Sequence, residues 1–536
     1  MSKKFIIIIS VIVGLLILAG LGVLIWWLVT DTSNDKFETI LLETDGLGQV
    51  KYNAAYTRIY GAGDIFWWFF PSTSDQSRPI LLFLGGVTGI PDSFLLNFGG
   101  IGPLDFNLNT RNTSLVSDYH LLFVDSLLGT GFSQLEDEQS ILTNLSDMVD
   151  NLIYTLQSFY GHNDEYEDAP LYIYAQGDAS HLAIPLTTRL LEDEDYSHKI
   201  KGIFLGNPII SPALTLTKLG FYLEELAYVD GNGRAAIEEF STSLSSLVSS
   251  KNFEEAFNQF FSLGEFINER AGAVAVNVGY IVEKLTRNSV RDYFGLSAYR
   301  DRVIPSDINM KSFMEETIAP ALGISNDNNY DEKRDDVIKA FRPLYMEPTV
   351  DKLENILNNS NVIVTIFNGN LDAVSNTPGQ LEWIDHLNWY GQTNFTNSER
   401  KTLVINKQIE GYFRESSRLN FYWINIAGQS TLLDNPVATK KMLERVTHIA
   451  PTPTEAVCKH FNELRSDLAL ALDLKNALAS CEFELQALRH QYEALNPGKT
   501  LTIPPSICNT STDGETKPVS EIIDVVGSPS ALNNTI

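Results

Sequence analysis

Cysteine is absent from most of this sequence, because Cys458, Cys481 and Cys508 all lie in its last fifth. The long region before them therefore cannot form a disulfide or a thiolate zinc cluster. Basic residues are also scarce, since 39 Lys and Arg stand against 67 Asp and Glu and give a formal net charge of −28. Such a charge repels a phosphate backbone, so we expect no nucleic-acid partner.

Histidine is scarce as well, with eight scattered residues. None pairs with a carboxylate or thiol at metal-ligand spacing, so we predict no metal and no cofactor. The chain has 536 residues, of which 44% are hydrophobic and 11% aromatic. This composition excludes a disordered or collagen-like chain and predicts a folded globular protein.

One long hydrophobic segment stands at the N-terminus. Phe5 to Val29 carries no charge, follows Lys3 and Lys4, and is long enough to cross a bilayer as a helix. By the positive-inside rule, residues 1–30 are predicted to be a cytoplasmic stub and a signal anchor, as in a single-pass type II membrane protein. The rest of the chain would then be lumenal or extracellular. A cleaved signal peptide is the alternative, but its apolar region is usually shorter.

Glycosylation sequons fit a secretory route without proving it, because a chain rich in Asn, Ser and Thr contains several by chance. The candidate acceptors on the body of the chain are Asn112, Asn144, Asn358 and Asn394, with Asn509 and Asn533 near the C-terminus.

Short apolar runs with turn residues at their ends predict buried strands near residues 65–70, 79–84, 120–125, 171–174 and 202–207. A helical period covers residues 139–160. Helical patterns then dominate from about 215 to 345, strands return at 361–367 and 421–426, and a helix is expected near 436–447. Continuously apolar strands separated by helices predict a mostly parallel central sheet. The fold class is therefore α/β, an α/β-hydrolase with a helical insertion as its cap.

Several motifs resemble the serine carboxypeptidases over about residues 50–448, most nearly their vitellogenic-like branch. The stretches that carry this resemblance are Phe66 to Pro71, Gly85-Gly86, Gly102-Pro103, Leu122 to Asp125, Gly129 to Ser133, Gly202-Ile203, Gly206-Asn207 and Asn368 to Asp372. The resemblance implies peptide cleavage from the C-terminus by a Ser-His-Asp triad.

The same resemblance implies that the triad is degenerate. The nucleophile position in the strand-to-helix turn falls on Gly177, and the histidine position falls on Gln429. The acidic member is retained as Asp372, which could equally be a turn or capping residue. Because an amide cannot accept the proton of a serine, two of the three catalytic groups are missing.

The groups that recognise a substrate carboxylate in the family are also replaced. Their positions map to Leu84, Gly100 and Gln176, none of which is ionisable. Gly86 still matches as an oxyanion-hole donor. A donor without a nucleophile does not start a reaction.

Two residues offer alternative nucleophiles. Ser180 has His181 beside it, but adjacent residues on a helix do not face each other. Asp178 would stand in the turn if the alignment shifted by one residue, although a missing histidine would still block turnover of an ester. Asp178 could also be a carboxylate that favours the N-terminus of a helix.

The resemblance ends near residue 450. We predict a stem at 31–50, the hydrolase domain at 51–448, a C-terminal helix at 452–496 and a flexible tail at 497–536. Apolar residues in the helix recur about every 3.5 residues, which is typical of a coiled coil, but the helix could also pack on its own domain. A homo-oligomer or another protein partner is expected through this helix.

The sequence therefore predicts a membrane-anchored pseudoenzyme that acts in binding, adhesion or assembly. The alternatives are a hydrolase of altered mechanism that uses Asp178 or Ser180, and a structural subunit of a membrane complex. Inactive α/β-hydrolase ectodomains that serve in adhesion provide the analogy for the first reading.

The cysteines give a first testable prediction. Cys458 and Cys481 lie on one predicted helix, roughly 35 Å apart, and cannot bridge each other while it is intact. We expect Cys481 to pair with Cys508 after the chain folds back, so non-reducing peptide mapping should find this disulfide. A dimer that Cys481→Ser abolishes and Cys458→Ser does not would show that Cys481 instead bridges two chains.

Overall fold

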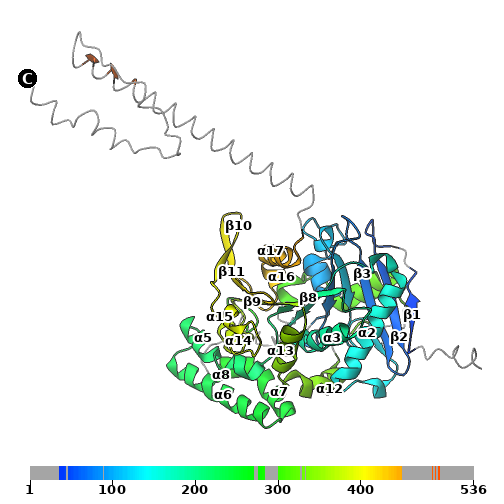
Figure 1. Ribbon diagram of the computed structural model, residues 1–536, viewed down its shortest axis with the longest axis horizontal. Helices are drawn as coiled ribbons and strands as arrows, with labels where there is room; N and C mark the ends of the chain where they lie inside the picture. The colour runs from blue at the N-terminus through cyan, green and yellow to red at the C-terminus, as the bar shows by residue number, and fades with distance from the viewer. Residues whose placement is uncertain are drawn as a thin grey trace, which may run out of the picture. The chain divides into compact units, whose positions relative to one another are not determined.

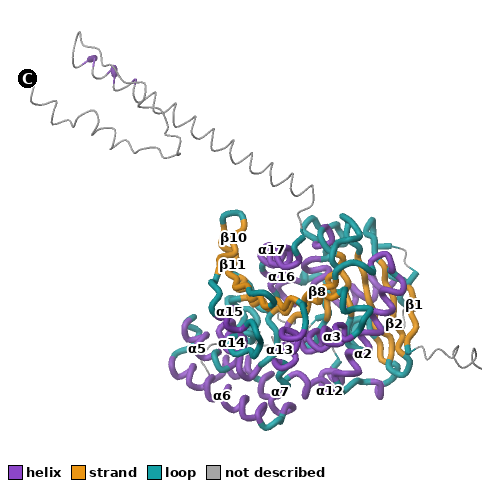
Figure 2. Tube along the Cα trace, in the orientation of Figure 1, coloured by secondary structure: helices purple, strands orange, loops and turns teal. Residues whose placement is uncertain are grey.

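A twelve-stranded sheet forms the centre of the computed structural model (Figures 1 and 2). The structure describes residues 36–43, 46–88, 90–270, 276–283, 300–325, 329–331 and 334–449, and five positions between 486 and 494. The strand order is β1-β2-β3-β5-β4-β7-β8-β9-β12-β11-β10, and β6 pairs with β3. The strands are β1 Phe37–Leu41, β2 Asn53–Ile59, β3 Gly63–Phe70, β4 Ile80–Leu84, β5 His120–Val124, β6 Gln134–Leu135, β7 Leu171–Gln176, β8 Ile200–Gly206, β9 Ile363–Gly369, β10 Lys401–Ile405, β11 Gln408–Glu415 and β12 Leu419–Ile424.

The middle of the sheet is parallel, from β5 through β4, β7, β8 and β9 to β12. Antiparallel strands flank it on both sides. The predicted mostly parallel sheet is therefore correct for the centre, whereas the whole sheet is mixed. The hairpin of β10 and β11 was not predicted from the sequence, because its strands are half exposed and lack a continuous apolar run.

Helices cover both faces of the sheet. One face holds α2 Leu145–His162, α3 Ser180–Glu192 and α13 Val350–Asn359, and the other holds η1 Asn97–Ile101, α16 Thr431–Asp434 and α17 Pro436–Thr447. Strand β3 shows why its sequence is apolar throughout, since Trp67 and Phe69 enter one core cluster while Phe66 and Trp68 enter the other. A strand covered on both sides has no solvent face on which to place polar residues.

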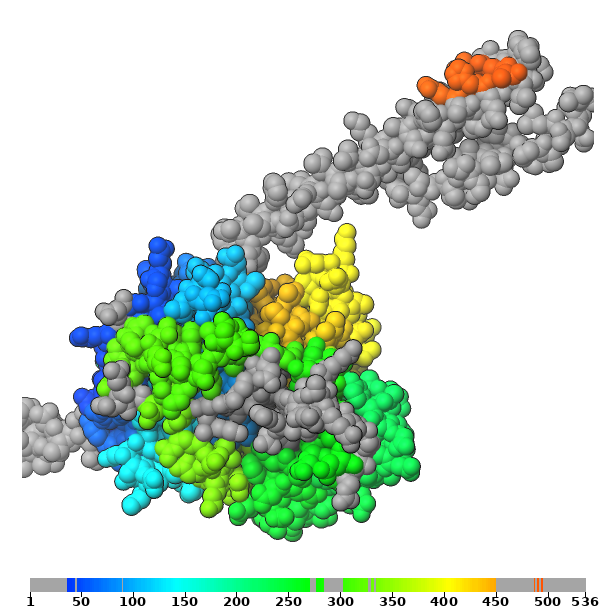
Figure 3. Space-filling model, turned by 180° about the vertical axis from the view of Figure 1, so that it is seen from behind, coloured from blue at the N-terminus to red at the C-terminus, as the bar shows by residue number. Residues whose placement is uncertain are grey.

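Helices also dominate the described parts of the predicted insertion, which is coloured green to yellow-green in Figures 1 and 3. They are α4 Pro212–Leu216, α5 Leu219–Glu225, α6 Gly231–Ser249, α7 Phe253–Phe261, α8 Leu263–Arg270, α9 Arg300–Val303, α10 Met310–Ser312, η7 Phe313–Ile318, α11 Ala319–Ala321 and α12 Asp335–Tyr345. After the insertion come α14 Thr377–Ile384 and α15 Gln392–Thr396, and short turns of helix are η2 Leu115–Ser117, η3 Glu138–Ser140, η4 Asp164–Tyr166 and η5 Gly177–Ala179.

The predicted stem at residues 31–50 needs correction, because β1 lies inside it and pairs with β2. Strand β1 is only partly buried, so its sequence lacks the apolar run that marks the central strands. No helix in the described part of the chain is long and apolar enough to cross a membrane. The predicted anchor at Phe5 to Val29 lies outside the described residues, as does nearly all of the predicted C-terminal helix.

Candidate functional site

The turn between β7 and α3 lies at the carboxyl edge of the parallel strands. Gly177 occupies this turn with φ +57°, a conformation that side chains other than glycine rarely adopt. A sharp strand-to-helix elbow with this geometry is where α/β-hydrolases expose a nucleophile. Gly177, and not Asp178, has the positive φ, so the alignment shift that would place Asp178 on the elbow is wrong.

Gln429 faces this turn from the loop before α16. If Gly177 carried a Cβ, the Nε2 of Gln429 would be its nearest neighbour among the described residues, at 3.6 Å. The structure therefore brings together the two positions that the sequence reading assigned to nucleophile and base. They are a residue without a side chain and an amide that cannot take up a proton at ordinary pH.

A second amide lies beside the first. Gln176, the last residue of β7, donates from Nε2 to the carbonyl oxygens of Gly206, at 3.0 Å, and of Gln429. Both glutamines are 5% exposed, and the Oε1 of each has no hydrogen-bond partner among the described residues. Two neutral amides, each with an unpaired oxygen, therefore lie at the elbow.

Asp178 is held by the loop after β4. Its carboxylate accepts hydrogen bonds from the backbone N–H of Val87 at 2.7 Å, the N–H of Thr88 at 3.3 Å and the hydroxyl of Thr88 at 2.5 Å. The carboxylate also lies against Gly86, where a Cβ would come within 2.4 Å of Oδ2. An internal carboxylate therefore occupies the donors next to the predicted oxyanion remnant.

Ser180 is buried in the first turn of α3, and its hydroxyl donates to the carbonyl oxygen of Gly177 at 2.8 Å. The positions that correspond to the predicted carboxylate clamp also pack against other parts of the domain. Leu84 is a buried residue of β4, and a Cβ on Gly100 would lie 2.9 Å from the Leu433 side chain.

Asp372 lies in the loop after β9 and is fully buried. It accepts hydrogen bonds from the Nδ2 of Asn207 at 2.7 Å and from the N–H of Val374 at 2.8 Å. The sequence reading singled out Gly206-Asn207 as a motif but missed this role for Asn207. Two adjacent parallel strands, β8 and β9, bring the pair together.

Residues 276–281 of the insertion cross the loops that carry Asp372 and Gln429. The carbonyl oxygen of Val278 accepts a hydrogen bond from the N–H of Ala373, and that of Gly279 accepts one from the N–H of Gln429. The N–H of Ile281 donates to the carbonyl oxygen of Leu371. The sequence offers no signal for this contact, since the partners lie about a hundred residues away or more.

Residues 46–449 match the serine carboxypeptidase family. The chain belongs to the serine carboxypeptidase family. Two curated relatives are the serine carboxypeptidase-like 51 protein of Arabidopsis thaliana and the retinoid-inducible serine carboxypeptidase of Rattus norvegicus. The first is 28% identical over 426 residues and the second 26% identical over 413 residues; each comparison covers 73% of this chain, with 91% and 90% of the relatives, respectively.

Among solved structures, a prohormone-processing carboxypeptidase from Saccharomyces cerevisiae has a TM-score of 0.63 at 19% identity. The match covers 77% of this chain and 97% of that one, and it confirms the α/β-hydrolase fold. Residues 437–501 also match the DNA methyltransferase 1-associated protein 1 family. This match covers only a small part of the chain and does not assign the whole chain to that family.

Burial raises the pKa values of several acid groups in this serine carboxypeptidase domain. It raises the pKa of Asp372 to about 7, against hydrogen bonds from Asn207 that lower it. It likewise raises the pKa of Asp178 to about 6 and of Asp125 to about 7, and holds the pKa of Asp92 well above its usual range. These carboxyl groups do not form a metal site, since no group of three or more metal-binding side chains occurs among the described residues.

These pKa values predict that the domain is more stable at mildly acidic pH than at pH 8. A carboxyl group whose folded pKa exceeds its usual value of 3.8 binds its proton more tightly in the native state. The stability that this tighter binding adds to the folded state is therefore lost as pH rises through about 4 to 7. Burial lowers the pKa of His120 and His181 to about 4. Between about pH 4 and 6.5 these histidines therefore increase stability as pH rises, which opposes the effect of the carboxyl groups.

Thermal unfolding between pH 4.5 and 8 measures this balance. We expect the Tm to reach its maximum below neutral pH. Asp372→Asn should make the fall of Tm with pH above that maximum less steep, because one titrating group is removed. A Tm that climbs steadily from pH 5 to 8 in both proteins would contradict the prediction.

Proposed function

We propose that this chain is a catalytically inactive member of the serine carboxypeptidase family that acts as a membrane-held binding module. The observation that carries the proposal is the pair of Gly177 and Gln429, which face each other at the elbow. Acyl transfer needs a nucleophile there and a base that takes its proton. Neither residue can serve.

The surroundings of the elbow support the same proposal. Asp178 is an unsuitable nucleophile, because Val87 and Thr88 hold its oxygens with three hydrogen bonds. Ser180 points its hydroxyl at the carbonyl of Gly177. The family's active members need an oxyanion hole, and here a carboxylate lies beside Gly86 where negative charge would develop.

The polar groups at the elbow suit binding more than chemistry. Gln176 and Gln429 present amide groups in place of ionisable ones, so the site can form hydrogen bonds without moving protons. The predicted signal anchor would hold the domain at a membrane, and the predicted C-terminal helix offers a route to a homo-oligomer or another protein. A structural subunit of a membrane complex remains the second reading, and stoichiometric co-purification of partners in mild detergent would favour it.

Activity measurements test the proposal. The full chain should hydrolyse no peptide at pH 4–7 and should not react with serine-directed probes. Loss of nucleophile and base reduces kcat by about 10⁶-fold in a serine hydrolase. The double variant Gly177→Ser, Gln429→His has room for the added Cβ at position 177. We expect its activity to remain poor, because the carboxylate clamp is replaced as well.

The matched control for this test is Asp178→Asn, which keeps the size of the side chain. Peptide hydrolysis by the natural chain that this substitution abolishes would overturn the proposal in favour of an aspartate mechanism. Probe labelling that Ser180→Ala removes would instead identify Ser180 as the nucleophile.

The membrane arrangement gives a separate prediction. With Lys3 and Lys4 before the apolar segment, sealed vesicles should protect residues 37–449 from added protease, and the mature chain should keep its N-terminus. Protease digestion with and without detergent, followed by N-terminal sequencing, measures both. A mature chain that begins near Thr30 would show that the segment is a cleaved signal peptide.

A further inference from the structure

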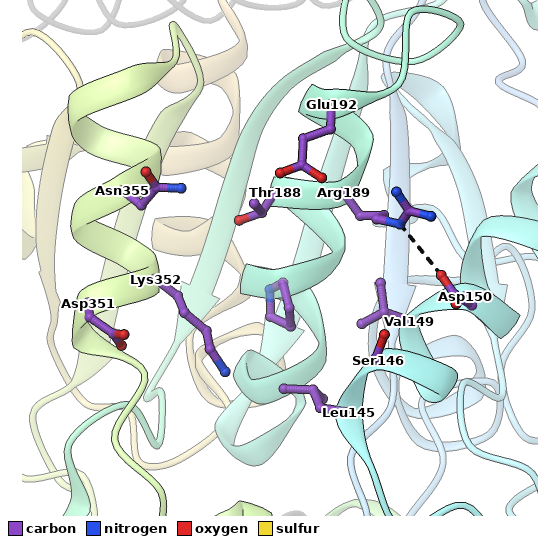
Figure 4. Close-up of a pocket in the computed structure, with 11 residues that line it drawn as sticks. Leu145, Ser146, Val149, Asp150, Thr188, Arg189, Glu192, Asp351, Lys352 and Asn355 are labelled. Carbon is purple, nitrogen blue, oxygen red and sulfur yellow. Dashed lines mark ion pairs between the residues drawn. The ribbon is translucent and has the colours of Figure 1, made fainter.

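A groove of about 510 Å³ lies between α2, α3 and α13, away from the elbow (Figure 4). Its apolar part is formed by Leu145 and Val149 of α2 and by Pro185 of α3. Lys352 and Asn355 extend from α13 toward α3, and Arg189 reaches across to Asp150 with an N–O distance of 3.5 Å. The groove therefore combines an apolar surface with polar walls of both charges.

This combination suits a carbohydrate better than a lipid or an ion. A pyranose ring has an apolar C–H face and a rim of hydroxyl groups that both donate and accept. Leu145 and Pro185, which are partly exposed, can contact the C–H face. Donors such as Lys352 and acceptors such as Glu192 can bind the hydroxyl groups. From Pro185 to Glu192 the groove follows α3 for about 10 Å, which is the length of a short oligosaccharide.

A glycan acceptor lies directly at one end of the groove. Asn144 belongs to the sequon Asn144-Leu145-Ser146, and both following residues line the groove. Asn144 is exposed and is the N-cap of α2: its Oδ1 accepts from Asp147 N at 2.9 Å, and its Nδ2 donates to the Asp147 carboxylate at 2.6 Å. A glycosylated amide keeps one N–H, so modification leaves both cap interactions possible.

The other sequons of the domain lack this arrangement. Asn112, Asn358 and Asn394 are exposed but do not belong to sequons that contribute lining residues. Asn358 also uses its amide to hold a neighbouring loop, donating to Asn388 O at 3.0 Å and accepting from Tyr390 N at 3.1 Å. Asn144 is thus distinguished by its position beside a polar and apolar groove.

We infer that an N-linked glycan on Asn144 lies in this groove and covers Leu145 and Pro185. The glycan acts there as a part of the folded domain, since its first sugars replace solvent between the three helices. The inference rests on the lumenal location proposed above, because N-glycans are added in the secretory pathway.

The experiment uses the full chain expressed through the secretory pathway of a eukaryotic cell. Ser146→Ala removes the sequon and leaves the Asn144 cap, whereas the matched variant Ser146→Thr keeps the sequon. We expect Ser146→Ala to lower the Tm by roughly 2–4 °C, and Ser146→Thr to unfold like the natural chain. Asn112→Gln, which removes a glycan away from the groove, should leave the Tm unchanged.

Enzymatic release of the glycans gives a second measurement. From the native protein, the Asn144 glycan should be released about tenfold more slowly than the Asn112 glycan, and the rates should converge after denaturation. Lys352→Ala should accelerate release at Asn144 alone. Equal native rates, or equal Tm values for Ser146→Ala and Ser146→Thr, would overturn the inference.

Glycopeptide analysis separates this inference from the proposed location. Asn144 unoccupied while Asn112 or Asn394 carries a glycan would overturn the inference and leave the lumenal location intact. A chain with no occupied sequon would overturn both.

Discussion

The parallel ladder from β5 to β12 is the constraint on which the rest of this molecule depends. Parallel strands end at a common edge, and here that edge carries the residues that follow β4, β7, β8, β9 and β12. Gly86, Gly177, Asn207, Asp372 and Gln429 come from five separate stretches of chain. They share one site because each follows a strand of the same ladder.

The elbow between β7 and α3 combines an unusual backbone conformation with contacts to neighbouring loops. Position 177 still has the left-handed backbone of a nucleophile elbow, although no side chain remains there. Around it the structure has filled the site with its own groups, since Asp178 binds the loop of Val87 and Thr88, and Gln176 binds the loop of Gln429. These contacts join three loops at the edge of the sheet, so the turn between β7 and α3 supports the packing of the domain.

Burial of acid groups follows from the same architecture. Asp92, Asp125, Asp178 and Asp372 lie beneath loops or helices where water cannot stabilise their charge, and their pKa values rise accordingly. In an acidic chain with a formal charge of −28, protonation of such groups also reduces repulsion. Protonation of these buried acids therefore favours the folded state of the domain.

The sequence by itself determined the family, the central strands and the two positions at the elbow, because buried strands and tight turns leave local patterns of apolar residues and glycine. It missed β1, β2, β6 and the β10–β11 hairpin, because none of these strands carries a long continuous apolar run. Only the tertiary structure decided that Asp178 binds Val87 and Thr88, that Asn207 holds Asp372, and that residues 276–281 cross the site. Those contacts join residues about a hundred positions apart or more, so their energy depends on how the chain packs and leaves no mark on any local stretch of sequence.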